Sequence, residues 1–232
     1  MKTSVKKNLI ILFLFIGVVF FTISLILIEP EKEDTQQMRA PLQSEKNENI
    51  VFLGDSITEW YAYDFYYKKG MPIINSGKAG YSSKTLLSQL VNMVYIYNPT
   101  TVIVLIGTND MNIPTYNRNE TLSNIENIIK SIKENRPHSK IYVQSIYPIN
   151  TSDDEKIDPI TVGIRDNEEI LTVNDEIKKI AGREKVEYID MHSELVDEKG
   201  ELNIYYTKDG LHLNELGYYI VTKKINHILE NE

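Results

Sequence analysis

"VFLGDSITEW", residues Val51–Trp60, carries an apolar strand directly into a glycine, a carboxylate and a hydroxyl. A strand is expected over Ile50–Leu53, followed by a helical stretch that continues to about Lys69. Ser56–Glu59 also fits the S-x-x-E capping box, in which the serine does no more than start a helix. The alternative is that the chain holds Ser56 at the carboxyl end of the strand for chemistry. The rest of the sequence distinguishes between these two interpretations.

Short apolar runs alternate with helical patterns along the following residues. Further strands are expected at Pro72–Asn75, at Thr101–Gly107, in "KIYVQSIYP" (140–148) and in "VEYIDM" (186–191). Apolar residues recur at helical spacing in four segments, namely Leu86–Val94, Leu122–Ile132, Ile170–Ile180 and Val221–Leu229. The run Thr101–Gly107 is apolar without alternation, as a strand covered on both faces must be. This order predicts an α/β fold with a five-stranded parallel sheet and helices on both of its faces.

Ligands of such sheets bind beyond the carboxyl ends of the strands, and four segments are expected to meet there. They are "GDS" (54–56), "NSGKAGYSS" (75–83), "GTND" (107–110) and "KDGLHLNELGY" (208–218). Together they supply a hydroxyl, an imidazole, a carboxylate, a carboxamide and glycine amides. Acyl transfer by a serine needs this set, since it requires a nucleophile, a base, a group that orients the base, and donors for the oxyanion. The combination favours catalysis by Ser56 over a helix cap alone.

The four segments resemble the sequence blocks of the SGNH hydrolases, the GDSL-type lipase and esterase superfamily, over Val51–Tyr218. The residues of the segments "GTND" and "DGLHLNELGY" are most similar to those of the bacterial lysophospholipase-like and platelet-activating-factor-acetylhydrolase-like esterases. One departure is Ile57, where the namesake motif has leucine. The resemblance implies a flavodoxin-like three-layer α/β/α sandwich that cleaves esters through a serine.

The resemblance also implies a catalytic triad. Ser56 would attack the ester carbonyl, His212 would take its proton, and Asp209 would hold the other ring nitrogen of His212. Imidazole suits this task because its unperturbed pKa of roughly 6.5 lets it accept and return a proton near neutrality. Gly210 gives the turn between Asp209 and His212 conformational freedom.

The oxyanion hole implied by the resemblance consists of the backbone N–H groups of Ser56 and Gly80 and the side-chain amide of Asn109. A glycine at position 80 lets the backbone approach the substrate. Asp55 and Asp110, next to these residues, are interpreted as turn-forming carboxylates and not as second catalytic acids. We expect no cofactor and no metal ion.

A second histidine competes with His212 for the role of base. Asp190 and His192 are two positions apart at the end of a strand, so they point to one face and can pair. The family pattern places no base there. His138 lies in a turn and His227 follows two lysines on the last helix, so both are expected in solvent.

Two further features are open to more than one interpretation. Residues 151–166 form a long polar insert after the fourth strand, which is either a lip over the active site or a plain exposed loop. An aromatic cluster can either wall a substrate pocket or pack into the core, which is the default at helical spacing. The cluster consists of Trp60, Tyr61, Tyr63, Phe65, Tyr66 and Tyr67.

The N-terminal part of the chain has a different character. Leu9–Ile28 is an apolar run of 20 residues, about the length that a bilayer requires of a helix. Lysines precede it and acidic residues follow it, so the positive-inside rule places residues 1–8 in the cytoplasm and the remainder outside. The competing interpretation is a cleaved secretory signal, which would have a shorter apolar region and a small-residue cleavage site. We expect residues 9–28 to be an uncleaved transmembrane anchor.

The composition of the other segments limits the functions that they can have. Residues 29–48 are polar and without apolar period, as in a flexible linker, which would span roughly 25 Å on average. The domain 49–232 holds 19 basic and 27 acidic side chains, and no basic cluster indicates nucleic-acid binding. The chain contains no cysteine, which excludes disulfides and a lipid-modified cysteine.

The favoured function is a membrane-anchored, extracytoplasmic serine esterase that acts on acyl or acetyl esters of lipids or cell-envelope glycans. An acyltransferase is an alternative because it uses the same acyl-enzyme. A non-catalytic binding module is disfavoured because no element of the triad is missing. A metal-dependent phosphoesterase built on Asp55, Asn109 and His212 would need further histidine and carboxylate ligands at these strand ends. The sequence predicts neither the acyl chain length nor the oligomeric state.

Overall fold

A computed structural model describes residues 49–63 and 72–230, which contain a five-stranded parallel sheet. Its strands are β1 (Ile50–Gly54), β2 (Ile73–Gly77), β3 (Thr101–Leu105), β4 (Lys140–Gln144) and β5 (Glu187–Ile189). They lie in the order β2-β1-β3-β4-β5, which is the flavodoxin-like order. Gly54 pairs with Gly77 and with Leu105, so the carboxyl ends of the three neighbouring strands are level. The predicted α/β fold with five parallel strands is confirmed.

Helices follow the strands where the apolar spacing predicts them, except that the helix expected over Leu86–Val94 is divided into two short helices at Gln89. On one side of the sheet lie α4 (Ser83–Ser88), α5 (Leu90–Met93), α6 (Arg118–Asn135) and α8 (Asn167–Glu184). The other elements are α2 (Ser56–Glu59), α7 (Pro159–Val162), α9 (His192–Leu195), α10 (Glu215–Glu230) and the 3₁₀ turns Tyr95–Tyr97 and Asp110–Asn112. The two longest helices, α6 and α8, start where a side chain satisfies a free backbone N–H group. Asn117 accepts from Glu120 N at the start of α6, and Asp166 accepts from Glu169 N at the start of α8.

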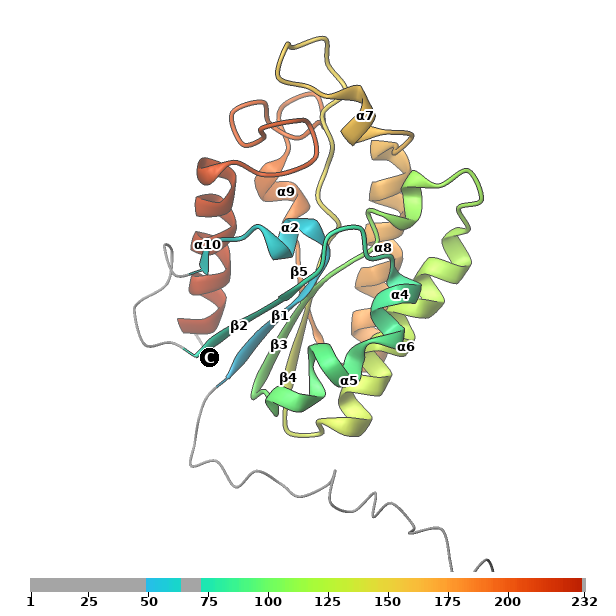
Figure 1. Ribbon diagram of the computed structural model, residues 1–232, viewed down its shortest axis with the longest axis vertical. Coiled ribbons are helices and arrows are strands. Elements are labelled where there is room, and N and C mark those ends of the chain that lie inside the picture. Colours follow the sequence, from blue (N-terminus) through green and yellow to red (C-terminus); the bar gives the residue numbers. More distant parts are fainter. Residues whose placement is uncertain (1–48, 64–71, 231–232) are drawn as a thin grey trace, which may run out of the picture. The chain divides into compact units, whose positions relative to one another are not determined.

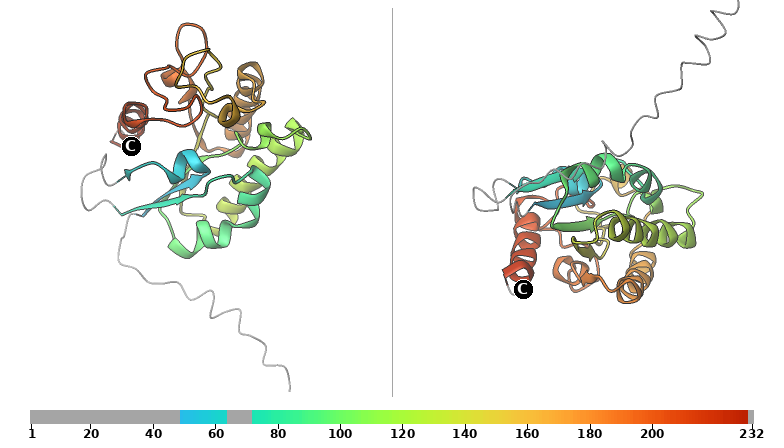
Figure 2. Two further views of the ribbon diagram at one scale, coloured as in Figure 1. Left: turned by 45° about the horizontal axis from the view of Figure 1, so that its top comes forward. Right: turned by 90° about the horizontal axis from the view of Figure 1, so that it is seen from below.

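The side chains of β1 alternate between two separate apolar clusters. Val51 and Leu53 pack with residues of α4, α6 and α8 on one face of the sheet. Ile50 and Phe52 pack with residues of α2, α9 and α10 on the other. Both faces are therefore buried, which explains the absence of polar alternation in the strands. The result is three layers, with the sheet between two sets of helices (Figures 1 and 2).

The helix after β1 is shorter than predicted. It ends at Glu59, where Trp60 N donates to Ser56 O at 3.0 Å and Tyr61 N donates to Thr58 O at 3.2 Å. Tyr61 and Tyr63 then turn into the core and pack on Phe52, with ring centroids 5.8 Å and 4.3 Å from its ring. Burial of these aromatic rings outweighs the helical spacing of the segment. The rest of the expected helix lies largely in residues 64–71, outside the described part of the chain.

The predicted anchor 9–28 and the linker 29–48 also lie outside the described residues. Within 49–63 and 72–230, no helix combines the length and the apolar character that spanning a bilayer would require.

Candidate active site

Ser56 is the first residue of α2, directly after the buried strand β1, and it is 6% exposed. The helix cap is Asp55 and not Ser56, since Asp55 Oδ1 accepts from Ile57 N at 3.0 Å. The carboxylate of Glu59 does not reach back to the serine, because it accepts from Ala79 N at 2.8 Å and pairs with Lys78. The capping-box interpretation is therefore wrong, and the Ser56 hydroxyl is left available for another partner.

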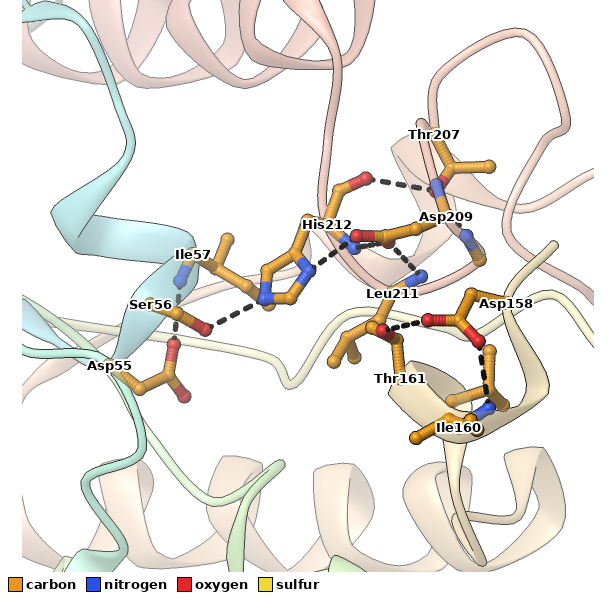
Figure 3. A network of polar contacts seen from close by, with 12 residues as sticks. Asp55, Ser56, Ile57, Asp158, Ile160, Thr161, Thr207, Asp209, Leu211 and His212 are labelled. Atoms are coloured by element: carbon orange, nitrogen blue, oxygen red, sulfur yellow. Dashed lines mark hydrogen bonds and ion pairs between the residues drawn. The ribbon is translucent and has the colours of Figure 1, made fainter. Parts of the chain in front are cut away.

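That partner is His212. Ser56 Oγ lies 2.9 Å from His212 Nε2, and His212 Nδ1 lies 2.7 Å from Asp209 Oδ2 (Figure 3). The other carboxylate oxygen of Asp209 accepts from Leu211 N at 3.0 Å and from His212 N at 2.7 Å. Gly210 has φ +95°, the left-handed conformation that this tight turn requires. The structure thus brings together the three residues predicted to form the triad.

The electrostatics of this turn suit a base held in one orientation. Burial raises the pKa of the Asp209 carboxyl, but hydrogen bonds from the His212 ring and from backbone N–H groups outweigh it, so the pKa lies below its ordinary value. Asp209 is therefore ionised at neutral pH and favours a proton on His212 Nδ1, which leaves Nε2 free to accept one. Thr207 Oγ1 donates to His212 O and accepts from Gly210 N, which fixes the turn from behind.

The residues predicted to form the oxyanion hole lie on the loops after β2 and β3. Gly80 has φ +77°, and an added Cβ would meet no heavy atom within 4 Å, so backbone conformation and not crowding requires glycine in this structure. Asn109 Nδ2 donates to Tyr81 O at 3.1 Å, which joins the two loops. One of the two N–H groups of this amide remains for another acceptor.

The structure adds a residue that the sequence did not single out. Arg165, 7% exposed, donates from Nη2 to Asn109 Oδ1 at 3.0 Å and from Nε to Thr108 O at 2.9 Å. It comes from the insert 151–166, which is therefore not a plain exposed loop. That the insert forms a lip over the active site stays a prediction. An arginine in a polar segment carries no local signal of burial, so no sequence pattern indicated it.

The competing base is placed differently. The Asp190 carboxylate accepts from Ser193 N at 3.1 Å and from Ser193 Oγ at 2.7 Å. The ring of His192 is buried, and its Nε2 has no hydrogen-bond partner among the described residues. Burial lowers the pKa of His192. The predicted alternative pair therefore makes no hydrogen bond, and the other two candidates, His138 and His227, are exposed.

Asp55 and Asp110 both have structural roles, as expected. Asp55 caps α2 and is fully buried, which raises its pKa to about 7. Asp110 accepts from Ser83 N at 2.8 Å and from Ser83 Oγ at 2.5 Å, and so holds the start of α4. The oxygen of Asn109 accepts from a guanidinium, which is an unsuitable neighbour for a metal cation. No three histidine or carboxylate side chains cluster as a metal site within the part of the chain that the structure describes.

A cavity of about 620 Å³ has Trp60, Lys208 and Leu213 in its lining, and none of the three triad residues. Trp60, which is 44% exposed, forms one wall, and its ring centroid lies 4.1 Å from that of His212. Leu213, Leu216 and Tyr218 add apolar surface, and Lys208 Nζ lies 4.0 Å from the centre of the Trp60 ring. The described part of the aromatic cluster thus divides, since Tyr61 and Tyr63 are core residues whereas Trp60 faces the cavity.

Comparisons with known proteins bear on the fold and the family of the chain. The profile of the GDSL-like lipase/acylhydrolase family matches residues 52–220. A solved structure from Streptococcus pneumoniae, provisionally named for platelet activating factor, is 33% identical and superimposes with a TM-score of 0.72, covering 92% of this chain and 98% of that one.

Two curated relatives differ in extent. The isoamyl acetate-hydrolyzing esterase of Saccharomyces cerevisiae is 25% identical in an alignment that covers 79% of this chain and 86% of the esterase. The N-acylneuraminate cytidylyltransferase of Escherichia coli is 28% identical over 183 residues. These are 78% of this chain but only 40% of that protein. The chain therefore spans less than half of this longer relative.

Proposed function

The chain belongs to the GDSL-like lipase/acylhydrolase family, and on that premise we propose that it is a serine esterase with the catalytic triad Ser56, His212 and Asp209. The observation that carries the proposal is the continuous pair of hydrogen bonds, 2.9 Å and 2.7 Å long, that links the hydroxyl to the imidazole and the imidazole to the carboxylate. Nucleophile, base and orienting group lie within the distances that proton transfer needs.

The reaction begins when Ser56 Oγ attacks the carbonyl carbon of the ester and its proton passes to His212 Nε2. The negative charge that develops on the carbonyl oxygen is stabilised by the backbone N–H groups of Ser56 and Gly80 and by Asn109 Nδ2. The C–O bond to the alcohol then breaks, and His212 gives its proton to the leaving oxygen. A water molecule then attacks the acyl carbon while His212 takes its proton. The bond between this carbon and Ser56 Oγ breaks, His212 returns the proton to Ser56 Oγ, and the carboxylic acid leaves.

The substrates are acyl or acetyl esters of lipids or cell-envelope glycans, and the enzyme is anchored by residues 9–28 with its domain outside the cytoplasm. Support for the location comes from the 20-residue apolar run and the charges that flank it. The cavity beside Trp60 offers an aromatic and aliphatic surface to one part of the ester. Transfer of the acyl group to a second alcohol is the alternative outcome, because the same acyl-enzyme serves both reactions.

The test uses the full-length protein, purified in detergent, with p-nitrophenyl esters from acetyl to palmitoyl. We expect hydrolysis that a serine-directed phosphonate abolishes, with the adduct mapped to Ser56 by mass spectrometry. A preference for acetyl would indicate deacetylation, and one for long chains would indicate lipid substrates. A phosphonate that leaves full activity, or that labels another residue, would contradict the proposal. Product analysis with added alcohols separates hydrolysis from acyl transfer.

The location is tested separately. Membranes that carry the full-length protein are washed with alkaline carbonate and then treated with protease from the outer side. Retention in the membrane with cleavage of the domain from outside is expected, whereas release into the wash would contradict the anchor.

A further inference from the structure

The side chain of Asn109 is held at both ends. Its Oδ1 accepts from Arg165 Nη2 at 3.0 Å, and its Nδ2 donates to Tyr81 O at 3.1 Å. A carboxamide is nearly symmetric in shape, so packing alone does not determine which end faces the substrate. A guanidinium has only hydrogen-bond donors, so it can pair with the oxygen of the carboxamide but not with its nitrogen. Arg165 thus selects the orientation in which the nitrogen remains available to an oxyanion.

Arg165 is itself fixed by four acceptors besides Asn109. Its Nε donates to Thr108 O and Oγ1 at 2.9 Å and 3.0 Å, and its Nη1 donates to Thr161 O and Val162 O at 3.0 Å and 2.7 Å. The side chain is buried, and a planar fork with five N–H groups satisfies this set in a way that the point charge of a lysine does not. Its position is therefore determined by the surrounding backbone.

The segment that carries Arg165 also contacts the turn of the triad. Asp158 caps α7 by accepting from Ile160 N at 3.0 Å and from Thr161 Oγ1 at 2.6 Å (Figure 3). Its own backbone N–H donates to Asp209 O at 3.0 Å. A single segment therefore supports both the residue that orients the base and the residue that holds the oxyanion donor.

We propose that Arg165 is a positioning residue for ester hydrolysis, which acts through Asn109 by fixing its amide toward the oxyanion. This inference rests on the proposed esterase function. The positive charge beside Oδ1 also polarises the carboxamide, so that the remaining Nδ2–H is a stronger donor when the negative charge develops. A donor that is already oriented needs no reorganisation in the transition state, and this makes such groups effective.

A double-mutant cycle tests the route through Asn109. Steady-state kcat and KM for a short-chain aryl acetate are measured for the full-length wild type, Arg165→Met, Asn109→Ala and the double variant. We expect Arg165→Met to lower kcat by about 10- to 100-fold, with KM changed less than about threefold. In the Asn109→Ala background the same substitution should change kcat less than about threefold, because the residue through which it acts is gone. Arg165→Lys should recover only part of the loss, since it keeps the charge without the fork.

The control is Arg118→Met, which removes an exposed arginine whose guanidinium pairs with Glu169. It should leave kcat unchanged. If thermal unfolding shows that Arg165→Met is not folded, the same cycle with Arg165→Lys tests whether Arg165 acts through Asn109. Multiplicative losses in the double variant, or an effect on KM alone, would overturn the role of Arg165 while leaving the esterase intact. A wild type without ester hydrolysis would instead count against the proposed function itself.

Discussion

Ser56 Oγ and His212 Nε2 lie 2.9 Å apart although 156 positions separate the two residues in the sequence. Contacts between α2 and α10 hold them together. Tyr218, on α10, donates from its hydroxyl to Ile57 O at 2.8 Å and stacks on Tyr61 with ring centroids 4.9 Å apart. These contacts join the segment that carries Ser56 to the helix that follows His212.

The first prediction concerns this pair. Ser56→Ala and His212→Ala should each lower kcat for a short-chain ester by at least about 10⁴-fold, because the two groups act as a unit. Ser56→Ala should leave the midpoint of thermal unfolding nearly unchanged, whereas His212→Ala also removes the contact of a buried ring with Trp60, so the midpoint is measured for both variants. His192→Ala is the matched control and should keep full activity, since Ser56 and Asp209 form their hydrogen bonds with the ring of His212 and not with that of His192. An active His212→Ala variant beside an inactive His192→Ala variant would reverse the assignment.

The second prediction concerns the group that orients the base. Asp209→Asn should lower kcat by about 10⁴-fold, because the amide stabilises the wrong tautomer of His212. KM should change much less, since Asp209 is expected to make no contact with the ester. Asp190→Asn is the control, as its carboxylate bonds to Ser193. Equal losses in the two variants would show that the effect is one of stability and not of the tautomer.

The sequence predicts the sheet because strands that are buried on both faces require continuous runs of apolar residues. The run Thr101–Gly107 has to be apolar throughout, and the helices have to repeat their apolar residues at helical spacing. The candidate triad is equally visible, since the chemistry needs those residue types at the strand ends. Where the structure differs, a tertiary contact outweighs a local pattern, as when Glu59 bonds to Ala79 in place of the capping box.

Arg165 illustrates what the sequence does not encode locally. Its burial depends on Thr108 and Asn109, which lie 57 and 56 positions earlier. A polar segment that contributes one buried cation has the same composition as an exposed loop, and only the tertiary arrangement separates the two.

The third prediction concerns the oxyanion donor. Asn109→Ala should lower kcat by about 10²- to 10³-fold, the usual loss when one such donor is removed. The fold should persist, because Arg165 keeps its acceptors on Thr108, Thr161 and Val162. Asn75→Ala is the control, since this amide bonds to backbone oxygens of Glu59 and Tyr61 and is not part of the proposed oxyanion hole. An unchanged rate for Asn109→Ala would remove this residue from the mechanism.

The fourth prediction concerns Asp55, the buried carboxyl beside the nucleophile. Its pKa is raised from the ordinary 3.8 to about 7, first by burial and only partly offset by the hydrogen bond from Ile57 N and by the charge of Arg165. Between these two values the folded protein binds more protons than the unfolded chain. The contribution of Asp55 to the free energy of unfolding should therefore fall as the pH rises through this window, by at most about 1.4 kcal/mol per pH unit, and should level off above it.

Asp55→Asn keeps the oxygen that accepts from Ile57 N but does not titrate. The difference in the free energy of unfolding, wild type minus Asp55→Asn, should consequently decrease from pH 4.5 to pH 7 and stay constant from pH 7.5 to pH 9, as measured by urea denaturation. Groups other than Asp55 titrate alike in both proteins, so they cancel in this difference. A difference that is flat across the lower range would mean that Asp55 stays ionised in the folded protein, and one that increases with pH would mean that neighbouring donors stabilise its charge.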